Sequence, residues 1–166
     1  RMTGDVDVLV DRSSYDDTLA CFRRAGFGPV MPPFRARWEQ RYGKDIALVG
    51  SSTVEIDLHL GLVGGYFGVG MDTGTLLDEL DGYALVGRRL PALRPVGRFL
   101  HAAIHSAAGP HPRLASAADV VVLAQSPHTT PHSVSELARR LGCEPLVASG
   151  IIRAGTAFGI DLDDFT

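Results

Sequence analysis

The spacing of hydrophobic and polar residues changes about half-way along the chain. In the first half, apolar and polar residues alternate with the period of two that predicts strands, or they form short apolar runs. These strand-like segments are residues 5–10, 34–42, 46–49, 53–62 and 83–90. Tyr15, Leu19 and Phe22 recur instead at helical spacing, behind the N-cap candidates Ser13 and Ser14. We therefore expect a helix soon after the first strand.

Beyond Pro95 the pattern becomes helical. The predicted helices are residues 99–108, 114–125, 134–141 and 146–158. Between the two halves, the glycine-rich segment 61–74 is predicted to be a loop and residues 76–80 a short helix. Strands followed by helices, rather than alternating with them, are typical of an α+β fold. We expect an α+β lobe over residues 1–90 and a helical lobe over residues 91–166 packed on it.

Composition limits the classes of protein that remain. The chain has 166 residues, of which 45% are hydrophobic and 21% charged, and these ordinary globular values exclude wholesale disorder. A formal net charge of −3 excludes a general polyanion binder, so we expect no nucleic-acid partner. No apolar run approaches the roughly 20 residues that span a bilayer, so we expect no membrane partner. Cys21 and Cys143 are isolated, which favours a reducing, cytoplasmic compartment over a disulfide framework.

Pairs of carboxylates occur on two of the predicted strands. Asp5 and Asp7 are two residues apart, so both side chains leave the same face of the strand, about 7 Å apart along it. Glu55 and Asp57 have the same spacing on the later strand. If the two strands are neighbours, up to four carboxylates converge, and their repulsion favours a divalent cation such as Mg²⁺ or Mn²⁺. The simpler alternative is that these acids form a solvated strand face.

The order of several motifs resembles a bacterial nucleotidyltransferase family within the DNA polymerase beta-like nucleotidyltransferase superfamily. Residues 4–10 (GDVDVLV) are similar to the Gly-x-Asp-x-Asp strand of the superfamily, and Arg1 precedes them as an arginine does in the family. The other similar motifs, in chain order, are Ala25-Gly26-Phe27, residues 54–59 (VEIDLH), the histidines of residues 100–105 (LHAAIH), Arg113-Leu114 and Asp119. The resemblance spans roughly residues 1–125.

The resemblance implies both a fold and a set of site residues. The fold would be a polymerase beta-like mixed sheet with flanking helices, followed by a small helical lobe. Asp5 and Asp7 would bind Mg²⁺ or Mn²⁺, with a nucleoside triphosphate (NTP) as substrate. Asp57 would be the third carboxylate, as a metal ligand or as the general base that activates the acceptor hydroxyl. Glu55 is the rival for that role and a further candidate metal ligand.

Four further residues are candidates for binding the nucleotide. Arg1 matches the family arginine and is expected to contact phosphate, while Gly4 allows a close approach of backbone or phosphate. His101 and His105 are at i and i+4 and share a helix face, so contact with substrate and simple packing are both open. A zinc hydrolase that uses these histidines with His59 is a third hypothesis. Ala102 stands where a His-Glu-x-x-His motif needs glutamate.

Two functions are therefore predicted as alternatives. The first is metal-dependent transfer of a nucleoside monophosphate from an NTP to an unidentified small-molecule, peptide or protein acceptor, with release of pyrophosphate. The second is a catalytically inactive nucleotidyltransferase-like binding or accessory protein. The superfamily's Gly-Ser element, which cradles the triphosphate, lies upstream of the acidic strand, so we expect that part of the lobe to precede Arg1. A second departure is Leu60, which stands where the family has an aromatic residue.

Overall fold

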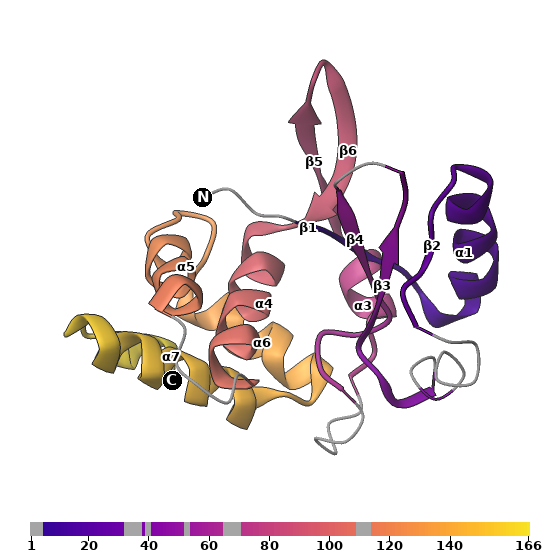
Figure 1. Ribbon diagram of the computed structural model, residues 1–166. Helices are drawn as coiled ribbons and strands as arrows, with labels where there is room; N and C mark the ends of the chain where they lie inside the picture. The colour runs from indigo at the N-terminus through magenta and orange to yellow at the C-terminus, as the bar shows by residue number, and fades with distance from the viewer. Residues whose placement is uncertain (1–4, 32–37, 39–40, 52–53, 65–70, 109–113) are drawn as a thin grey trace. The chain divides into compact units, whose positions relative to one another are not determined.

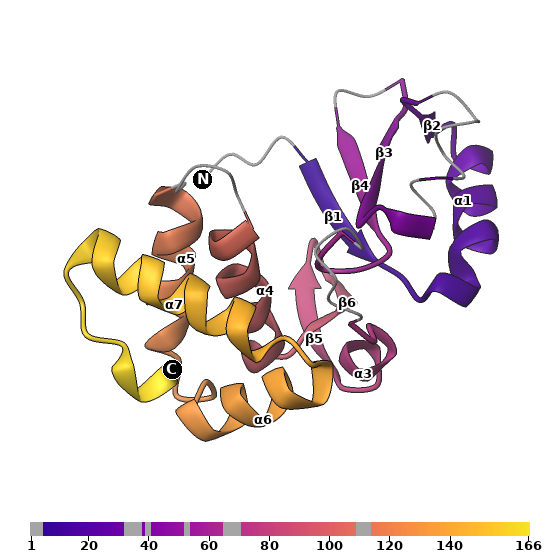
Figure 2. The same ribbon diagram turned by 90° about the horizontal axis from the view of Figure 1, so that it is seen from below.

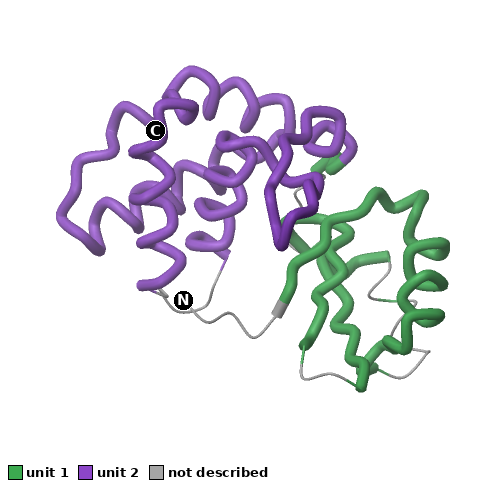
Figure 3. Tube along the Cα trace, turned by 90° about the horizontal axis from the view of Figure 1, so that it is seen from above, with its two compact units in different colours: residues 1–73 green, residues 74–166 purple. Residues whose placement is uncertain are grey.

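The protein divides into two compact units in a computed structural model. Unit 1 is Arg1–Thr73 and unit 2 is Gly74–Thr166 (Figure 3). The structure describes residues 5–31, 38, 41–51, 54–64, 71–108 and 114–166, and for Asp5 the backbone alone. The hairpin over residues 80–93 belongs to unit 2, whereas an α+β lobe over residues 1–90 would contain most of it. The packing of one lobe on the other stays a prediction.

Unit 1 is built on a four-stranded mixed sheet in the order β1-β4-β3-β2 (Figures 1 and 2). The strands are β1 (Asp5–Leu9), β2 (Gly28–Pro29), β3 (Asp45–Val49) and β4 (Glu55–His59). β1 runs parallel to β4, whereas β3 is antiparallel to both β4 and β2. The predicted strand 5–10 therefore lies directly beside the predicted strand 53–62, and the mixed sheet that we expected is confirmed.

The two faces of this sheet differ in polarity because side chains alternate along each strand. One face carries Ile46, Leu48, Ile56 and Leu58, which are buried against Tyr15 and Leu19 of helix α1 (Tyr15–Arg24). α1 begins after a 3-10 turn, η1 (Arg12–Ser14). The N-cap residue of this turn is Asp11, whose carboxylate accepts a hydrogen bond from the backbone N–H of Ser13. It ends before Gly26, at φ 86°. The opposite face carries the acidic positions.

Unit 2 is mainly helical, as the spacing beyond Pro95 predicts. Its helices are α3 (Gly74–Leu77), α4 (Pro95–Ala108), α5 (Leu114–Ala124), α6 (Pro131–Leu141), α7 (Glu144–Phe158) and the 3-10 turn η3 (Asp163–Phe165). α4 is the central helix: Phe99, Leu100 and Ile104 are fully buried, and α5, α6 and α7 pack against it. Together with the mixed sheet of unit 1, these helices confirm the α+β class with a helical lobe.

Two predicted strands are corrected by the structure. Residues 83–90 are not one strand but parts of a hairpin, β5 (Leu80–Leu85) and β6 (Arg88–Leu93). Val86 and Gly87 form its turn with φ of 48° and 72°, and because valine is a typical strand residue it hides this turn in the sequence.

The predicted strand over residues 34–42 is wrong where the structure describes it. Trp38, Arg41 and Tyr42 are helical, and the other residues of that segment lie outside the described residues. The rings of Trp38 and Tyr42 have centroids 5.7 Å apart, a contact that the i, i+4 spacing of a helix provides. Trp38 is half-exposed, so it is not part of the core.

Candidate functional site

The polar face of the sheet in unit 1 brings acidic residues from distant parts of the sequence together. In the parallel pair formed by β1 and β4, Asp5 lies opposite Glu55 and Asp7 lies opposite Asp57. Directly opposite residues project to the same face of a sheet. Asp7 and Asp57 are therefore neighbours on one face of the sheet, and the backbone of Asp5 lies opposite Glu55.

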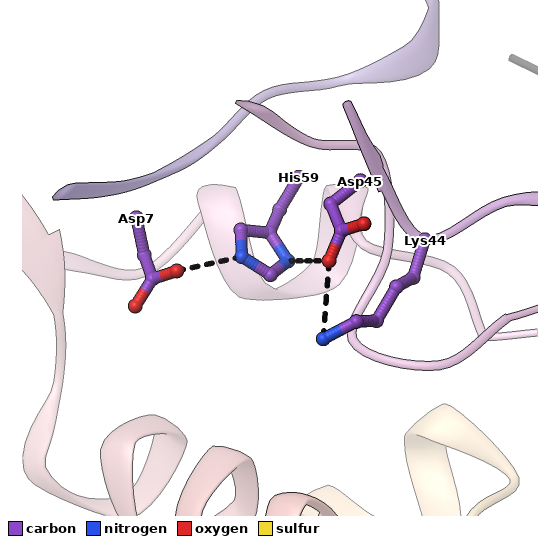
Figure 4. A network of polar contacts seen from close by, with 4 residues as sticks. All are labelled: Asp7, Lys44, Asp45 and His59. Carbon is purple, nitrogen blue, oxygen red and sulfur yellow. Dashed lines mark hydrogen bonds and ion pairs between the residues drawn. The ribbon is translucent and has the colours of Figure 1, made fainter. Parts of the chain in front are cut away.

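A buried histidine connects this face to a third strand. His59 ends β4, and its Nε2 lies 2.8 Å from Oδ1 of Asp7 (Figure 4). An ionised carboxylate only accepts hydrogen bonds, so the imidazole donates to Asp7 through Nε2. On its other side, Nδ1 of His59 lies 4.0 Å from Oδ2 of Asp45, which begins β3 and is opposite His59 in the antiparallel register. Asp45 also pairs with Lys44 at 3.1 Å.

Burial and the neighbouring carboxylates both raise the pKa of Asp57. Partial burial is the largest cause that raises the pKa of Asp57 above its ordinary value, followed by the negative charge of Asp45. His59 lowers that pKa, while Asp7 and Glu55 raise it further. Carboxylates gathered on a partly desolvated face repel one another, and a bound cation would relieve this repulsion.

The donor set on this face fits a hard divalent cation. One ligand atom each from Asp7, Asp57 and His59 all lie within 4.8 Å of one another. Carboxylate oxygens are the ligands that Mg²⁺ and Mn²⁺ prefer, and imidazole is accepted by Mn²⁺ and by zinc. Because His59 Nε2 already donates to Asp7, the histidine is placed to orient that carboxylate, as outer-shell partners of metal ligands do. Asp7 and Asp57 are therefore the candidate cation ligands on this face.

Comparison with known proteins adds a family to this geometry. The sequence model of the family described as "Uncharacterised nucleotidyltransferase" matches residues 1–159, nearly the whole chain. The chain belongs to this family. No curated protein and no solved structure matches it significantly. Within the described part of this nucleotidyltransferase-family chain, no helix combines the length and hydropathy needed to cross a bilayer.

The remaining predicted site residues of this family member are distributed as follows. Arg1 and Gly4 lie outside the described residues. Glu55 is exposed at the start of β4, two residues before Asp57 and on the same face of the strand. His101 and His105 lie in unit 2 on α4, where their ring centroids are 5.7 Å apart, as expected for one helix face. Their contact with a substrate stays a prediction, as does the zinc hydrolase.

Sequence reasoning missed Asp45 and Lys44. Their only signal is a Lys-Asp pair directly before the apolar run 46–49, which is also typical of a solvated strand start. Strand pairing turns Asp45 into a site residue because the antiparallel register of β3 and β4 sets it opposite His59. His59 itself continues the acidic alternation of β4, and that alternation is the signal that predicts its place on this face.

Proposed function

We propose that this chain is a metal-dependent nucleotidyltransferase that moves a nucleoside monophosphate from an NTP to an acceptor hydroxyl. The acceptor class includes small molecules, peptides and proteins. The observation that carries the proposal is the pairing of Asp7 with Asp57 across β1 and β4, on a sheet face that also holds Asp5 and Glu55 positions. Membership of a nucleotidyltransferase family supports the reaction type.

The carboxylates of this face would hold the cation. Asp5, Asp7 and Asp57 are the proposed ligands for Mg²⁺ or Mn²⁺, with Glu55 as a further candidate from the same face. A bound cation neutralises charge on the triphosphate oxygens and on the departing pyrophosphate. His59 would act as a positioning residue, because its hydrogen bond to Oδ1 fixes the orientation of the Asp7 carboxylate.

Asp57 would take the proton of the acceptor. The acceptor oxygen attacks the α-phosphorus of the NTP, and the bond from that phosphorus to the bridging oxygen of the β-phosphate breaks. Pyrophosphate leaves with the bonding electrons, and the proton of the acceptor hydroxyl passes to the Asp57 carboxylate. Asp57 would take this role as an alternative to binding the cation, because burial and the neighbouring carboxylates raise its pKa whereas a coordinated cation would lower it.

Further contacts to the nucleotide are proposed for residues of the matched motifs. Arg1 would bind a phosphate oxygen as a fixed cation, and Gly4 would leave space for the phosphate beside the backbone. His101 and His105 would contact substrate from α4. Each of these roles rests on the family motif in which the residue occurs.

The substitution Asp7→Asn tests the proposal. It keeps the size and the hydrogen-bond acceptor of the side chain but removes its charge. Calorimetry with ATP and with GTP, each with and without Mg²⁺, is expected to show Mg²⁺-dependent binding that weakens about tenfold or more in the variant. Pyrophosphate release is expected to fall with it. Asp17→Asn, at an exposed acid in the first turn of α1, is the matched control and is expected to leave both unchanged. Equal NTP binding by Asp7→Asn and the unsubstituted chain would contradict the proposal.

One observation favours the second candidate function, a nucleotidyltransferase-like binding or accessory protein without catalysis. Asp7 is hydrogen-bonded to His59 at 2.8 Å, and this charge-assisted pair can serve a purely structural role. The same calorimetry separates the two functions, because a binding protein of this kind would show no Mg²⁺-dependent affinity for either nucleotide.

A further inference from the structure

A polar hollow of about 500 Å³ lies within unit 2, and none of its lining residues belongs to the proposed metal site. Its lining comes from Leu80 and Asp81 of β5, the first residues of α4 and one side of α6. Its charged and titratable lining residues are Glu79, Asp81, Arg94, His128, Glu136 and Arg140. The volume is within the range of roughly 300–1,000 Å³ that small-molecule sites occupy.

Two arginines in the lining converge on one carboxylate. Nη1 of Arg94 donates to Oε2 of Glu79 at 2.7 Å, and Nη1 of Arg140 donates to Oε1 at 3.4 Å. The two guanidinium groups come from positions 46 residues apart by number, before α4 and at the end of α6, so the fold alone brings them together. These bonds lower the pKa of Glu79, Arg94 contributing most, and so keep that carboxylate ionised between the arginines.

The arginine pair has more hydrogen-bond donors than the protein uses. A guanidinium group has five N–H donors, and in the described part of the chain each of these two makes one such bond, to Glu79. Two positive charges against one carboxylate leave a net positive charge at this end of the hollow. Unused planar donors with net positive charge are the arrangement that binds carboxylate and phosphate groups.

The rest of the lining limits the ligand to one anionic group. Glu136 and Asp81 add two more carboxylates, so the lining as a whole has three carboxylates and two arginines, although Asp81 also pairs with Arg89 at 3.8 Å. A polyanion such as a triphosphate would be repelled by these carboxylates. We propose that this hollow is a binding site for a small molecule that presents a single carboxylate or phosphate group to Arg94 and Arg140. The site needs neither a metal nor an NTP, so it is independent of the proposed function.

Titrations with inorganic phosphate and with acetate test this proposal on the full chain. NMR of the arginine Nε–Hε groups at constant ionic strength is expected to show saturable shifts for at least one of them, with a Kd in the millimolar range or tighter, as suits so few ligand atoms. If phosphate binds more tightly than acetate, the natural ligand presents a phosphoryl group; if acetate binds more tightly, it presents a carboxylate. No saturation by either up to about 50 mM would overturn the proposal.

Variants on one helix localise the binding. For whichever of the two probes binds, Arg140→Gln is expected to raise the Kd at least fivefold. Arg139→Gln, one residue earlier on α6 and outside the lining, is expected to change this Kd less than twofold. Glu79→Gln keeps an oxygen acceptor but removes the competing charge, so it is expected to tighten binding about threefold or more. Equal weakening by Arg139→Gln and Arg140→Gln, or weaker binding in Glu79→Gln, would overturn the assignment. Asp7→Asn is expected to leave this binding unchanged.

Discussion

The buried imidazole of His59 is in contact with two strands other than its own. Through Nε2 it holds Asp7 of β1, and through Nδ1 it faces Asp45 of β3. His59 is 5% exposed, whereas the Asp7 side chain is more than half exposed. The carboxylate is therefore held from the interior while remaining accessible to a ligand. This is the geometry that a cation-binding aspartate needs, because an ordered carboxylate loses less conformational entropy when it binds.

Cys143 is the residue whose ionisation is most strongly affected by its surroundings. It is fully buried, its Sγ lies 3.6 Å from the carbonyl oxygen of Ala138, and burial, followed by the negative charge of Glu144, raises the pKa of the thiol to about 11. The unfolded thiol ionises near 9.0, so between these pH values the unfolded chain loses a proton that the folded chain keeps. The folded state therefore loses stability as the pH rises through this window.

The expected loss is about 2–3 kcal/mol between pH 8 and pH 11 from this one group. Urea denaturation under reducing conditions at several pH values measures it. Cys143→Ala is expected to lower stability near neutral pH but to have a shallower decline above pH 9, whereas Cys21→Ala, at an exposed thiol, is expected to keep the slope of the unsubstituted chain. Parallel slopes for all three chains would contradict the prediction. Tyr15, whose pKa burial also raises, contributes equally to each of them.

At the scale of secondary-structure elements, the close packing of α4 and α7 depends on a glycine. A Cβ atom built on Gly150 of α7 would lie 1.9 Å from the carbonyl oxygen of Ala103 in α4. No side chain fits at that distance, so the backbones of the two helices can approach only because residue 150 has none. Arg153, one turn further on, donates from Nη1 to the carbonyl oxygen of Ala107 at 2.8 Å and joins the same two helices.

Gly150→Ala is expected to destabilise the protein by about 1–3 kcal/mol, because α4 and α7 must separate to admit the methyl group. The gain in helix propensity, about 1 kcal/mol, offsets only part of this cost. Thermal or urea denaturation followed by far-UV circular dichroism measures the change. Ser149→Ala, on the exposed side of α7, is the matched control and is expected to stay within about 0.5 kcal/mol of the unsubstituted chain. A Gly150→Ala variant as stable as this control would contradict the packing argument.

The hairpin β5–β6 shows the opposite case, an element with little burial. Most of its residues are exposed, and Val86 at its turn is 94% exposed. A β-branched residue at positive φ is unfavourable, since the side chain meets its own backbone. Local preference alone would therefore not form this turn; antiparallel pairing from Leu80 with Leu93 to Leu85 with Arg88 holds it.

At the scale of the whole molecule, each compact unit has its own buried core. In unit 1 the core lies between α1 and the sheet, and in unit 2 it lies around α4. The single tryptophan, Trp38, belongs to unit 1, whereas the longer helices belong to unit 2. Tryptophan fluorescence therefore reports on unit 1, and the circular dichroism signal of helices reports mainly on unit 2.

Mg²⁺ is expected to stabilise the two units unequally. If the cation binds at Asp7 and Asp57, saturating Mg²⁺ raises the stability of unit 1 by about 2–3 kcal/mol at a hundredfold excess over its Kd. In urea titrations the fluorescence transition is expected to move to higher urea, while the helical transition moves less or not at all. Asp7→Asn is expected to abolish the difference. Equal displacement of both transitions by Mg²⁺ would show instead that the two units unfold together.

Sequence alone determined the elements whose pattern is local. The strands β1, β3 and β4 and the helices from Pro95 onward follow from periodicity, capping residues and glycines, which act within a few residues. Periodicity also determined which side chains share a face, so the shared face of Glu55 and Asp57 and the buried apolar face were both predictable. The helical state of Trp38, Arg41 and Tyr42 was not, because alternating apolar and charged residues also allow a helix when i, i+4 contacts such as that of Trp38 with Tyr42 form.

Tertiary structure decided which strands are neighbours and in what register. β1 and β4 are separated by about fifty residues, and only their parallel pairing sets Asp7 against Asp57. Only the register of β3 brings Asp45 to His59, and only the end of α6 meeting the start of α4 brings Arg140 to Glu79 beside Arg94. Such non-local contacts depend on how the whole chain packs. The hydrophobic and polar pattern of a short segment does not specify that packing. The sequence therefore determined the acidic strands, and the fold determined the site that they form.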